Sequence, residues 1–327
     1  MNPLEQFPAG RRLNLVGCGR VGKTLARLWQ MHDRLQIQDV LTTSPASAAA
    51  AIEFMGAGHA VNSLADMRPA ELWMIATPDA QIADMSRQLA EVQARHAGAG
   101  GLGGGAFCAG KGGARAAGGG HGAERPAAQA LSPSTTLVFH SSGALGSDQL
   151  APLQNLGWRT ASAHCILSFA TPQVAVAQFT GTACALEGDR TACTTLRAAF
   201  SAIGARCFEV ASADKLRYHA AAVFATNFLP VLQSVAEDLW RNTGVPPAWI
   251  PDLRASLLHN AVANITALGP QGALTGPAAR GDVAAIARQG AAVSAWSSEA
   301  GAAYFALSAL ALQMAQAHAQ SPVHTKP

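Results

Sequence analysis

Residues 13–22 read LNLVGCGRVG, an apolar run followed by glycines in the spacing GxGxxG. The run 13–16 predicts a buried strand, and apolar residues that recur at helical spacing after it predict a helix. Such a turn needs its first glycine for a tight bend, its second for close approach of a diphosphate, and its third for helix packing. The helix N-terminus adds unpaired N–H donors and the positive end of the helix dipole. The sequence therefore favours a dinucleotide-binding turn over a glycine turn without a ligand, formed by Gly17, Cys18, Gly19, Arg20, Val21 and Gly22.

The rest of the chain divides by its pattern into two expected domains. Apolar runs alternate with helix-period segments over residues 1–211, which predicts an α/β domain with a Rossmann-like, doubly wound, mostly parallel sheet. Its strands are expected at 13–16, 35–41, 59–61, 72–76, 136–140, 159–163, 182–186 and 207–210. Long helical segments at 213–242, 247–268 and 282–320 predict a smaller all-helical domain over 212–327. The Gly/Ala-rich tract 98–130 is expected to be a disordered surface insertion rather than a phosphate loop, because it follows no strand.

Composition excludes several classes of function. The chain has 327 residues, 49% of them hydrophobic and 13% charged, with a formal net charge of +3. Such a chain folds, and it lacks the basic excess that would attract nucleic acid or an anionic membrane. Its six cysteines show no zinc-ligand spacing, so we expect reduced thiols and no metal site. The N-terminus lacks the apolar core of a signal peptide, and no apolar stretch spans a bilayer securely, so a cytoplasmic location is expected.

The end of the second expected strand bears on the choice of cofactor. NAD-binding turns place Asp or Glu about 20 residues beyond the glycines, whereas Thr42, Thr43 and Ser44 stand here. Hydroxyl groups can bond a 2′-phosphate, and no carboxylate repels it. We therefore expect Thr43 and Ser44 to contact NADP, with NAD possible. Asp39 lies a few residues earlier and could reach the ribose if the strand boundary lies elsewhere. Arg20 either faces the phosphates or is a solvated surface residue.

Polar residues follow three other expected strands, at the sheet edge where ligands of open α/β sheets bind. These residues are Thr77, Pro78, Asp79, His140, Ser141, Ser142 and His164. The first three and the two serines are candidates for cofactor contact, and the imidazoles are candidates for orienting a substrate. Helix capping by Asp79 and turn stabilisation by the serines are the structural alternatives.

A further set of candidates lies in the expected helical domain. Lys215 and His219 stand four residues apart and share a helix face, which Asn227 continues at further steps of four. An ammonium can stabilise or protonate charge that develops during hydride transfer, and an imidazole can relay a proton. A surface lysine and a satisfied core histidine are an equally open alternative. Arg280 could bind an anion or form a clamp with Asp282.

Five motifs occur in order along the chain, namely GCGRVG, IATPDAQI, FHSSGALGSDQLAPL, KLRYHAAAVFATN and ALTGPAARGD. Together they resemble one family, the Rossmann-like proteins that carry the C-terminal domain of unknown function DUF2520. The family is similar to the 6-phosphogluconate dehydrogenase-like superfamily, and more distantly to pyrroline-5-carboxylate reductase and ketopantoate reductase. Dehydrogenases of that superfamily use a helical-domain lysine followed by Asn or His one turn later, a pair that Lys215 and His219 resemble. Thr43 and Cys165 depart from the pattern, since relatives often have arginine and proline there.

The resemblance implies a nicotinamide-dependent oxidoreductase that works as a homodimer through its helical domain. We expect hydride transfer to or from a small C=O or C=N substrate, with Lys215 as acid or electrostatic stabiliser and His219 assisting. His140, His164, Asn227 and Arg280 would bind the substrate. The alternative is a non-catalytic NADP(H)-binding sensor or partner-binding protein. The low charge content independently hints at a subunit contact.

Overall fold

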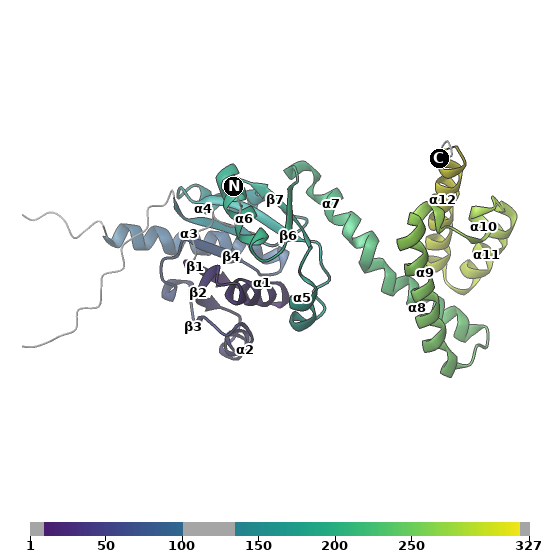
Figure 1. Ribbon diagram of the computed structural model, residues 1–327, viewed down its shortest axis with the longest axis horizontal. Coiled ribbons are helices and arrows are strands. Elements are labelled where there is room, and N and C mark those ends of the chain that lie inside the picture. Colours follow the sequence, from purple (N-terminus) through teal and green to yellow (C-terminus); the bar gives the residue numbers. More distant parts are fainter. Residues whose placement is uncertain (1–9, 101–134, 321–327) are drawn as a thin grey trace, which may run out of the picture. The chain divides into compact units, whose positions relative to one another are not determined.

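The computed structural model describes residues 10–100 and 135–320, without the side chains of 97–100 (Figure 1). The chain forms two compact units, Met1–Phe224 and Ala225–Pro327. This division places the helix that begins at Lys215 with the first unit, whereas the expected boundary at 211–212 placed it with the helical domain. Residues 101–130 of the expected insertion lie outside the described residues, and 98–100 continue a helix.

The first unit is built on one eight-stranded sheet in the order β3-β2-β1-β4-β5-β6-β7-β8. Every neighbouring pair is parallel except β6 and β7, which are antiparallel. The expected Rossmann-like, mostly parallel sheet is therefore confirmed. The strands are β1 Arg11–Val16, β2 Leu35–Leu41, β3 His59–Val61, β4 Leu72–Ile75, β5 Leu137–His140, β6 Arg159–Cys165, β7 Ala183–Gly188 and β8 Arg206–Glu209.

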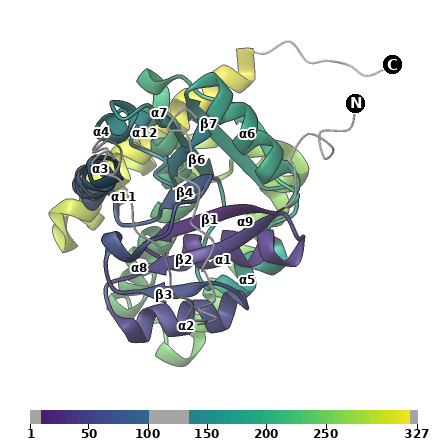
Figure 2. The same ribbon diagram turned by 90° about the vertical axis from the view of Figure 1, so that its left-hand side faces the viewer.

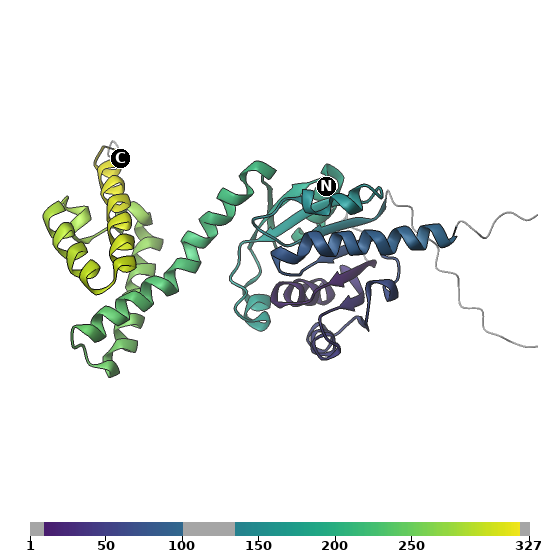
Figure 3. The same ribbon diagram turned by 180° about the vertical axis from the view of Figure 1, so that it is seen from behind.

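Helices cover both faces of this sheet. One face is covered by α1 (Arg20–Met31), α2 (Pro45–Met55), α5 (Pro172–Gln178) and α6 (Arg190–Ser201) (Figure 2). The other packs under α3 (Asp79–Gly100) and α4 (Ala151–Gln154), and α3 crosses it in Figure 3. The central strands are apolar on both faces because helices cover both faces of the sheet. Successive side chains point to opposite faces, so in β4 Leu72 and Met74 lie in one core and Trp73 and Ile75 in the other.

An aromatic cluster fixes α1 against the sheet. Trp29 is fully buried, and its indole N–H donates to the carbonyl of Ala199, 3.0 Å away. Its ring meets Phe200 and Phe139 edge-on, at centroid distances of 5.2 and 6.4 Å. Because α1 starts at the glycine turn, this packing also holds the turn against the sheet edge.

The helix α7 (Lys215–Ala222) follows β8 and a short 3-10 turn, Ser212–Asp214. It continues into a π-helical turn, Val223–Asn227, and the division between the two compact units falls within this turn, after Phe224. A π turn takes more residues than an α turn. The number of residues per turn therefore changes within this segment, and the shared face expected for Asn227 and Lys215 stays a prediction.

The described part of the second unit is helical. It contains α8 Phe228–Asn242, α9 Ile250–Gly272, α10 Gly276–Ala279, α11 Val283–Trp296 and α12 Ser298–Gln320. The single helix expected over 282–320 is wrong, because Ser297 adopts an extended conformation and separates α11 from α12. A kink interrupts α9 at Gly269, just before Pro270, close to the end predicted at residue 268.

Candidate functional site

The glycine turn that joins β1 to α1 is tightly packed at its first glycine and open at its second. Gly17 has φ +80°, and an added Cβ would lie 2.9 Å from the Ala76 carbonyl, so only glycine fits there. An added Cβ on Gly19 would meet nothing within 4 Å, which leaves open space above the turn. At Gly22 an added Cβ would lie 3.4 Å from the Ala76 side chain, an ordinary contact that alanine would also make.

This open space is part of a cavity of about 600 Å³. The hydroxyl Oγ1 of Thr77 is buried and has no hydrogen-bond partner among the described residues. It therefore remains available to a ligand. Lys23 is the only charged residue in the described lining, which consists of Gly17, Cys18, Gly19, Lys23, Thr42, Thr43, Ala46, Ser47, Ala50, Ala76, Thr77, Pro78 and Gln81.

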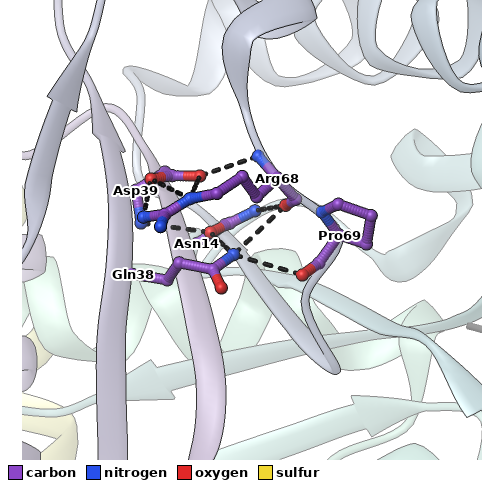
Figure 4. A network of polar contacts seen from close by, with 5 residues as sticks. All are labelled: Asn14, Gln38, Asp39, Arg68 and Pro69. Atoms are coloured by element: carbon purple, nitrogen blue, oxygen red, sulfur yellow. Dashed lines mark hydrogen bonds and ion pairs between the residues drawn. The ribbon is translucent and has the colours of Figure 1, made fainter. Parts of the chain in front are cut away.

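Asp39 is not available to a ribose, so the expectation that it could reach the cofactor is wrong. Its carboxylate is fully buried and accepts hydrogen bonds from the Arg68 guanidinium, the shortest at 2.5 Å, and from the Arg68 backbone N–H at 2.7 Å (Figure 4). Asn14 and Gln38 complete the network in Figure 4 through the backbone carbonyls of Arg68 and Pro69. Asp39, the one carboxylate in β2, is therefore bonded within the protein and is not available to a ligand.

Some predicted cofactor residues make contacts within the protein. The Ser44 hydroxyl caps α2 by accepting from the Ser47 backbone N–H at 3.2 Å. Arg20 donates to the carbonyl of Ala170 at 3.4 Å and is not among the described cavity residues. Val21 packs against the apolar core. Thr43 and Pro78 do line the cavity, and so do Ser47 and Lys23, which sequence reasoning missed.

The thiol of Cys18 lies beneath the turn. Its Sγ is 3.8 Å from Sδ of Met55. Burial raises the pKa of the Cys18 thiol to about 12. Cys18 therefore supplies its backbone and a small apolar volume, not a nucleophile.

The turn after β5 is braced by Ser142, Asp79 and His140. Ser142 Oγ donates to Asp79 at 2.7 Å and accepts from the N–H groups of Ala144 and Leu145. Nδ1 of His140 accepts from the Ser142 N–H at 3.2 Å, so its Nε2–H donates to the Gly146 carbonyl at 2.9 Å. Burial lowers the pKa of His140, which keeps this fully buried imidazole neutral. Ser141 is half-buried, and its side chain forms no hydrogen bond with the described residues.

Lys215 reaches this turn from the first residue of α7. Its side chain is only 1% exposed, and Nζ donates to the Ser142 carbonyl at 3.1 Å and to Ser162 Oγ at 2.7 Å. Burial lowers the pKa of Lys215, and the nearby carboxylates of Glu187 and Asp79 oppose that shift. An ammonium has three donors, so two of them are used within the first unit.

His164 and His219 lie together beside Gly143. Their rings meet edge-on at a centroid distance of 5.4 Å, and Nδ1 of His164 is 2.8 Å from the Tyr218 hydroxyl. An added Cβ on Gly143 would lie 2.4 Å from His219 Nδ1 and 2.9 Å from the His164 ring, so only glycine allows this approach. Nδ1 of His219 is buried without a hydrogen-bond partner among the described residues. Burial, with His219 and Lys215 nearby, lowers the pKa of His164 to about 4.

The first unit therefore brings Lys215, His219 and His164 to the carboxyl ends of β5 and β6. The expectation that His164 follows the strand expected at 159–163 is wrong, because β6 extends to Cys165 and includes His164. Asn227 and Arg280 belong to the second unit, and their roles stay predictions. The alternative clamp between Arg280 and Asp282 is not formed among the described ion pairs, and Asp282 instead caps α11 by accepting from the Ala285 N–H at 2.9 Å.

Two kinds of site are not found in the described residues. No group of three or more His, Cys, Asp or Glu side chains there could hold a metal ion. No helix within residues 10–100 and 135–320 is long and apolar enough to cross a membrane.

Comparison with known proteins supports the same fold. Residues 182–311 match the family model "Domain of unknown function (DUF2520)", and no curated protein matches the chain in sequence. The structure of protein TM1727 from Thermotoga maritima is 20% identical, with a TM-score of 0.65 over 94% of this chain and 100% of that one. Protein BF3122 from Bacteroides fragilis, named as a candidate NADP oxidoreductase, is 18% identical, with a TM-score of 0.64 over 93% and 98%.

A more distant neighbour holds a nicotinamide cofactor. Pyrroline carboxylate reductase from Plasmodium falciparum, solved with NADP bound, is 10% identical and has a TM-score of 0.51, over 93% of this chain and 98% of that one. At these identities the likeness is one of fold. The chain has a Rossmann-like fold, and its residues 182–311 match the family model of the domain of unknown function DUF2520.

Proposed function

We propose that the first unit binds NADP(H) at its glycine turn and that the protein is an NAD(P)-dependent oxidoreductase. The substrate would be a small molecule with a C=O or C=N bond. The observation that carries the proposal is the cavity at this turn, whose described lining contains one lysine and several hydroxyls but no carboxylate. The fold shared with an NADP-bound reductase and with a candidate NADP oxidoreductase supports it.

The lining favours a phosphorylated ribose. Lys23 lies one helical turn beyond Gly19, and both residues line the same cavity as Thr43 and Ser47. An ammonium and two hydroxyl groups match a 2′-phosphate, whereas Asp39 is already paired with Arg68. NAD would leave Lys23 without its phosphate and so would bind more weakly.

The turn itself would hold the diphosphate. Gly19 leaves room for it, the first N–H groups of α1 are unpaired donors, and the buried Thr77 hydroxyl lacks a partner among the described residues. A bound nicotinamide ring supplies hydride chemistry. What the protein must add is orientation of the substrate and control of a proton.

The residues proposed for that second task are Lys215 and His219, with His140, His164, Asn227 and Arg280 in substrate binding. Burial lowers the pKa of Lys215, so its ammonium gives up a proton more readily than an exposed one. The buried Nδ1 of His219 has no described partner and could bond a substrate. His140 has both ring nitrogens engaged, so its contribution would be to hold the turn.

One observation favours the second candidate, a non-catalytic NADP(H) sensor. Lys215 is 1% exposed and already donates to Ser142 and Ser162 within its own unit. A lysine committed to structure in this way would brace the turn after β5 and take no part in turnover.

Two measurements on purified full-length protein separate these functions. Cofactor binding is measured by quenching of protein fluorescence with NADPH and NADH. NADPH oxidation is then followed at 340 nm with a panel of small cyclic imines, ketones and aldehydes, for the wild type and Lys215→Met. The enzyme proposal expects turnover with at least one compound and its loss in K215M with cofactor affinity retained. NADPH binding without turnover across the panel would favour the sensor, and no binding would refute both.

We also propose that the protein is a homodimer in the cytoplasm. Only five described residues of the second unit are buried, namely Ile250, Ala278, Ile286, Gly290 and Gly301. Large apolar side chains there are exposed, including Leu268 at 62%, Val262 at 58% and Leu310 at 54%. Apolar surface on this scale is typical of subunit contacts. Five described cysteines are free thiols, which fits a reducing compartment.

Light scattering after size exclusion tests the dimer at micromolar concentration. The wild type is expected at twice the chain mass of 33.5 kDa, and Val262→Glu at the monomer mass. A wild-type protein that elutes only as a monomer would contradict the proposal.

A further inference from the structure

A buried carboxylate in β7 lies outside every motif of the sequence. Glu187 is 6% exposed, and each of its carboxylate oxygens accepts two hydrogen bonds. Oε1 accepts from Ser147 Oγ at 2.9 Å and Ser212 Oγ at 2.7 Å, and Oε2 accepts from the Ser147 N–H at 2.8 Å and Ser162 Oγ at 2.9 Å. A carboxylate that accepts four hydrogen bonds and donates none is in its ionised form, because a protonated carboxyl would need an acceptor for its own proton.

Two of these donors connect Glu187 to Lys215. Ser162 Oγ accepts a hydrogen bond from Lys215 Nζ at 2.7 Å and donates its own hydrogen bond to Glu187 Oε2, so one hydroxyl bridges the two charges. Ser212 lies in the 3-10 turn Ser212–Asp214, directly before α7 begins at Lys215. Glu187 therefore holds both ends of this lysine, its ammonium through Ser162 and its backbone through Ser212.

We propose that Glu187 is the positioning residue for Lys215, holding the ammonium charged and aimed at the Ser142 carbonyl through the Ser162 hydroxyl. The proposal deepens the proposed function, since it rests on that function for the part that Lys215 takes in turnover. The contacts themselves exist whether or not the protein turns over a substrate.

The surroundings of Lys215 explain why such support is needed. A buried ammonium is costly unless it is paired. Asp79 and Asp148 also favour its charge, whereas the neutral imidazoles of His140 and His164 add none, and the Cys184 thiol lies buried nearby. Asp79 accepts from Ser142 Oγ and has no described hydrogen bond to the ammonium. Among the described residues, Ser162 is therefore the only one whose side chain is hydrogen-bonded both to the Lys215 ammonium and to a carboxylate.

The chain offers a direct way to measure the charge of Lys215. The sequence contains only four lysines, at positions 23, 111, 215 and 326. Protein labelled with ¹³Cε-lysine therefore gives at most four signals, and the one that Lys215→Met removes belongs to Lys215. Its chemical shift is followed from pH 6 to pH 11 in the wild type, Glu187→Gln, Ser162→Ala and a control, Glu209→Gln. Glu209 lies on the adjacent strand β8, where its exposed side chain forms an ion pair with Arg197.

Glu187→Gln removes the charge and keeps the shape, so burial acts on Lys215 with less opposition. The titration midpoint of Lys215 is expected to fall by about one pH unit, the lower end for loss of a nearby opposite charge. Ser162→Ala, which keeps the carboxylate and its other donors, is expected to lower it in the same direction, and E209Q to leave it unchanged.

A Lys215 midpoint that stays at the wild-type pH in both E187Q and S162A would overturn the proposal. If E187Q does not fold, S162A alone decides in the same way. The NMR readout needs no cofactor or substrate, so a protein that binds no nicotinamide would refute the proposed function and leave this result standing. In an active enzyme, E187Q should also move the alkaline limb of the kcat profile to lower pH.

Discussion

Lys23 is the residue on which the choice between NADP and NAD should depend. It is half-buried and is the only charged residue in the described lining of the cavity at the glycine turn. Lys23→Gln keeps most of the side-chain length and removes the charge. A hydrogen bond to a charged group contributes ~1.5–3 kcal/mol, and because Lys23 is not fully buried we take the lower end. A loss of ~1.5 kcal/mol corresponds to roughly a tenfold rise in Kd.

The assay is isothermal titration of the full-length protein with NADPH and with NADH at fixed ionic strength. NADPH should bind roughly tenfold more weakly to K23Q, and NADH should change less than twofold. Arg27→Gln is the matched control, because it removes the same charge from the same helix at a residue that bonds the Met55 carbonyl at 3.1 Å. Equal losses for both cofactors in K23Q, or an equal effect of R27Q, would refute the reasoning.

Three further predictions concern the turns and the buried imidazole. Gly17→Ala places a Cβ 2.9 Å from the Ala76 carbonyl at φ +80°, so the melting temperature of this variant and its affinity for NADPH should both fall. Gly22→Ala is the control, and it should match the wild type in thermal-shift assays. Gly143→Ala would press on both neighbouring imidazoles, so turnover should fall with the Kd for NADPH within twofold, and retained turnover would contradict the site. Burial lowers the pKa of His164 to about 4, below the unfolded value near 6.5. Between these two pH values the unfolded state binds more protons than the folded state, so the free energy of unfolding should fall as the pH drops from 6.5 towards 4. The urea midpoint of His164→Gln should therefore depend less on pH between 7 and 5 than that of the wild type.

Much of the fold follows from local pattern. Buried parallel strands are continuous apolar runs, so 13–16 and 72–76 were predictable within a residue or two. The antiparallel direction of β7 was not, because a short apolar run looks the same in either direction. The break at Ser297 was also missed, since the Ala-rich segments on either side have the same helical character.

The site was predictable only where function depends on neighbours in sequence. The glycine turn and Thr77 stand in local motifs beside their strands. Lys23 lies outside the glycine motif, although its spacing of four from Gly19 was a usable signal. Glu187 gave no signal, because the residues it binds come from distant segments. The pairing of Asp39 was hidden for the same reason, since its partner lies 29 residues away.

The most direct test of the account is calorimetric titration of the wild-type protein with NADPH, NADP⁺, NADH and NAD⁺. We predict saturable 1:1 binding per chain for the phosphorylated pair, about tenfold tighter than for the unphosphorylated pair, since Lys23 adds one charge-assisted contact. Absence of binding heat with all four nucleotides, together with no thermal stabilisation by any of them, would contradict the claim that the turn from Gly17 to Gly22 holds a nicotinamide dinucleotide.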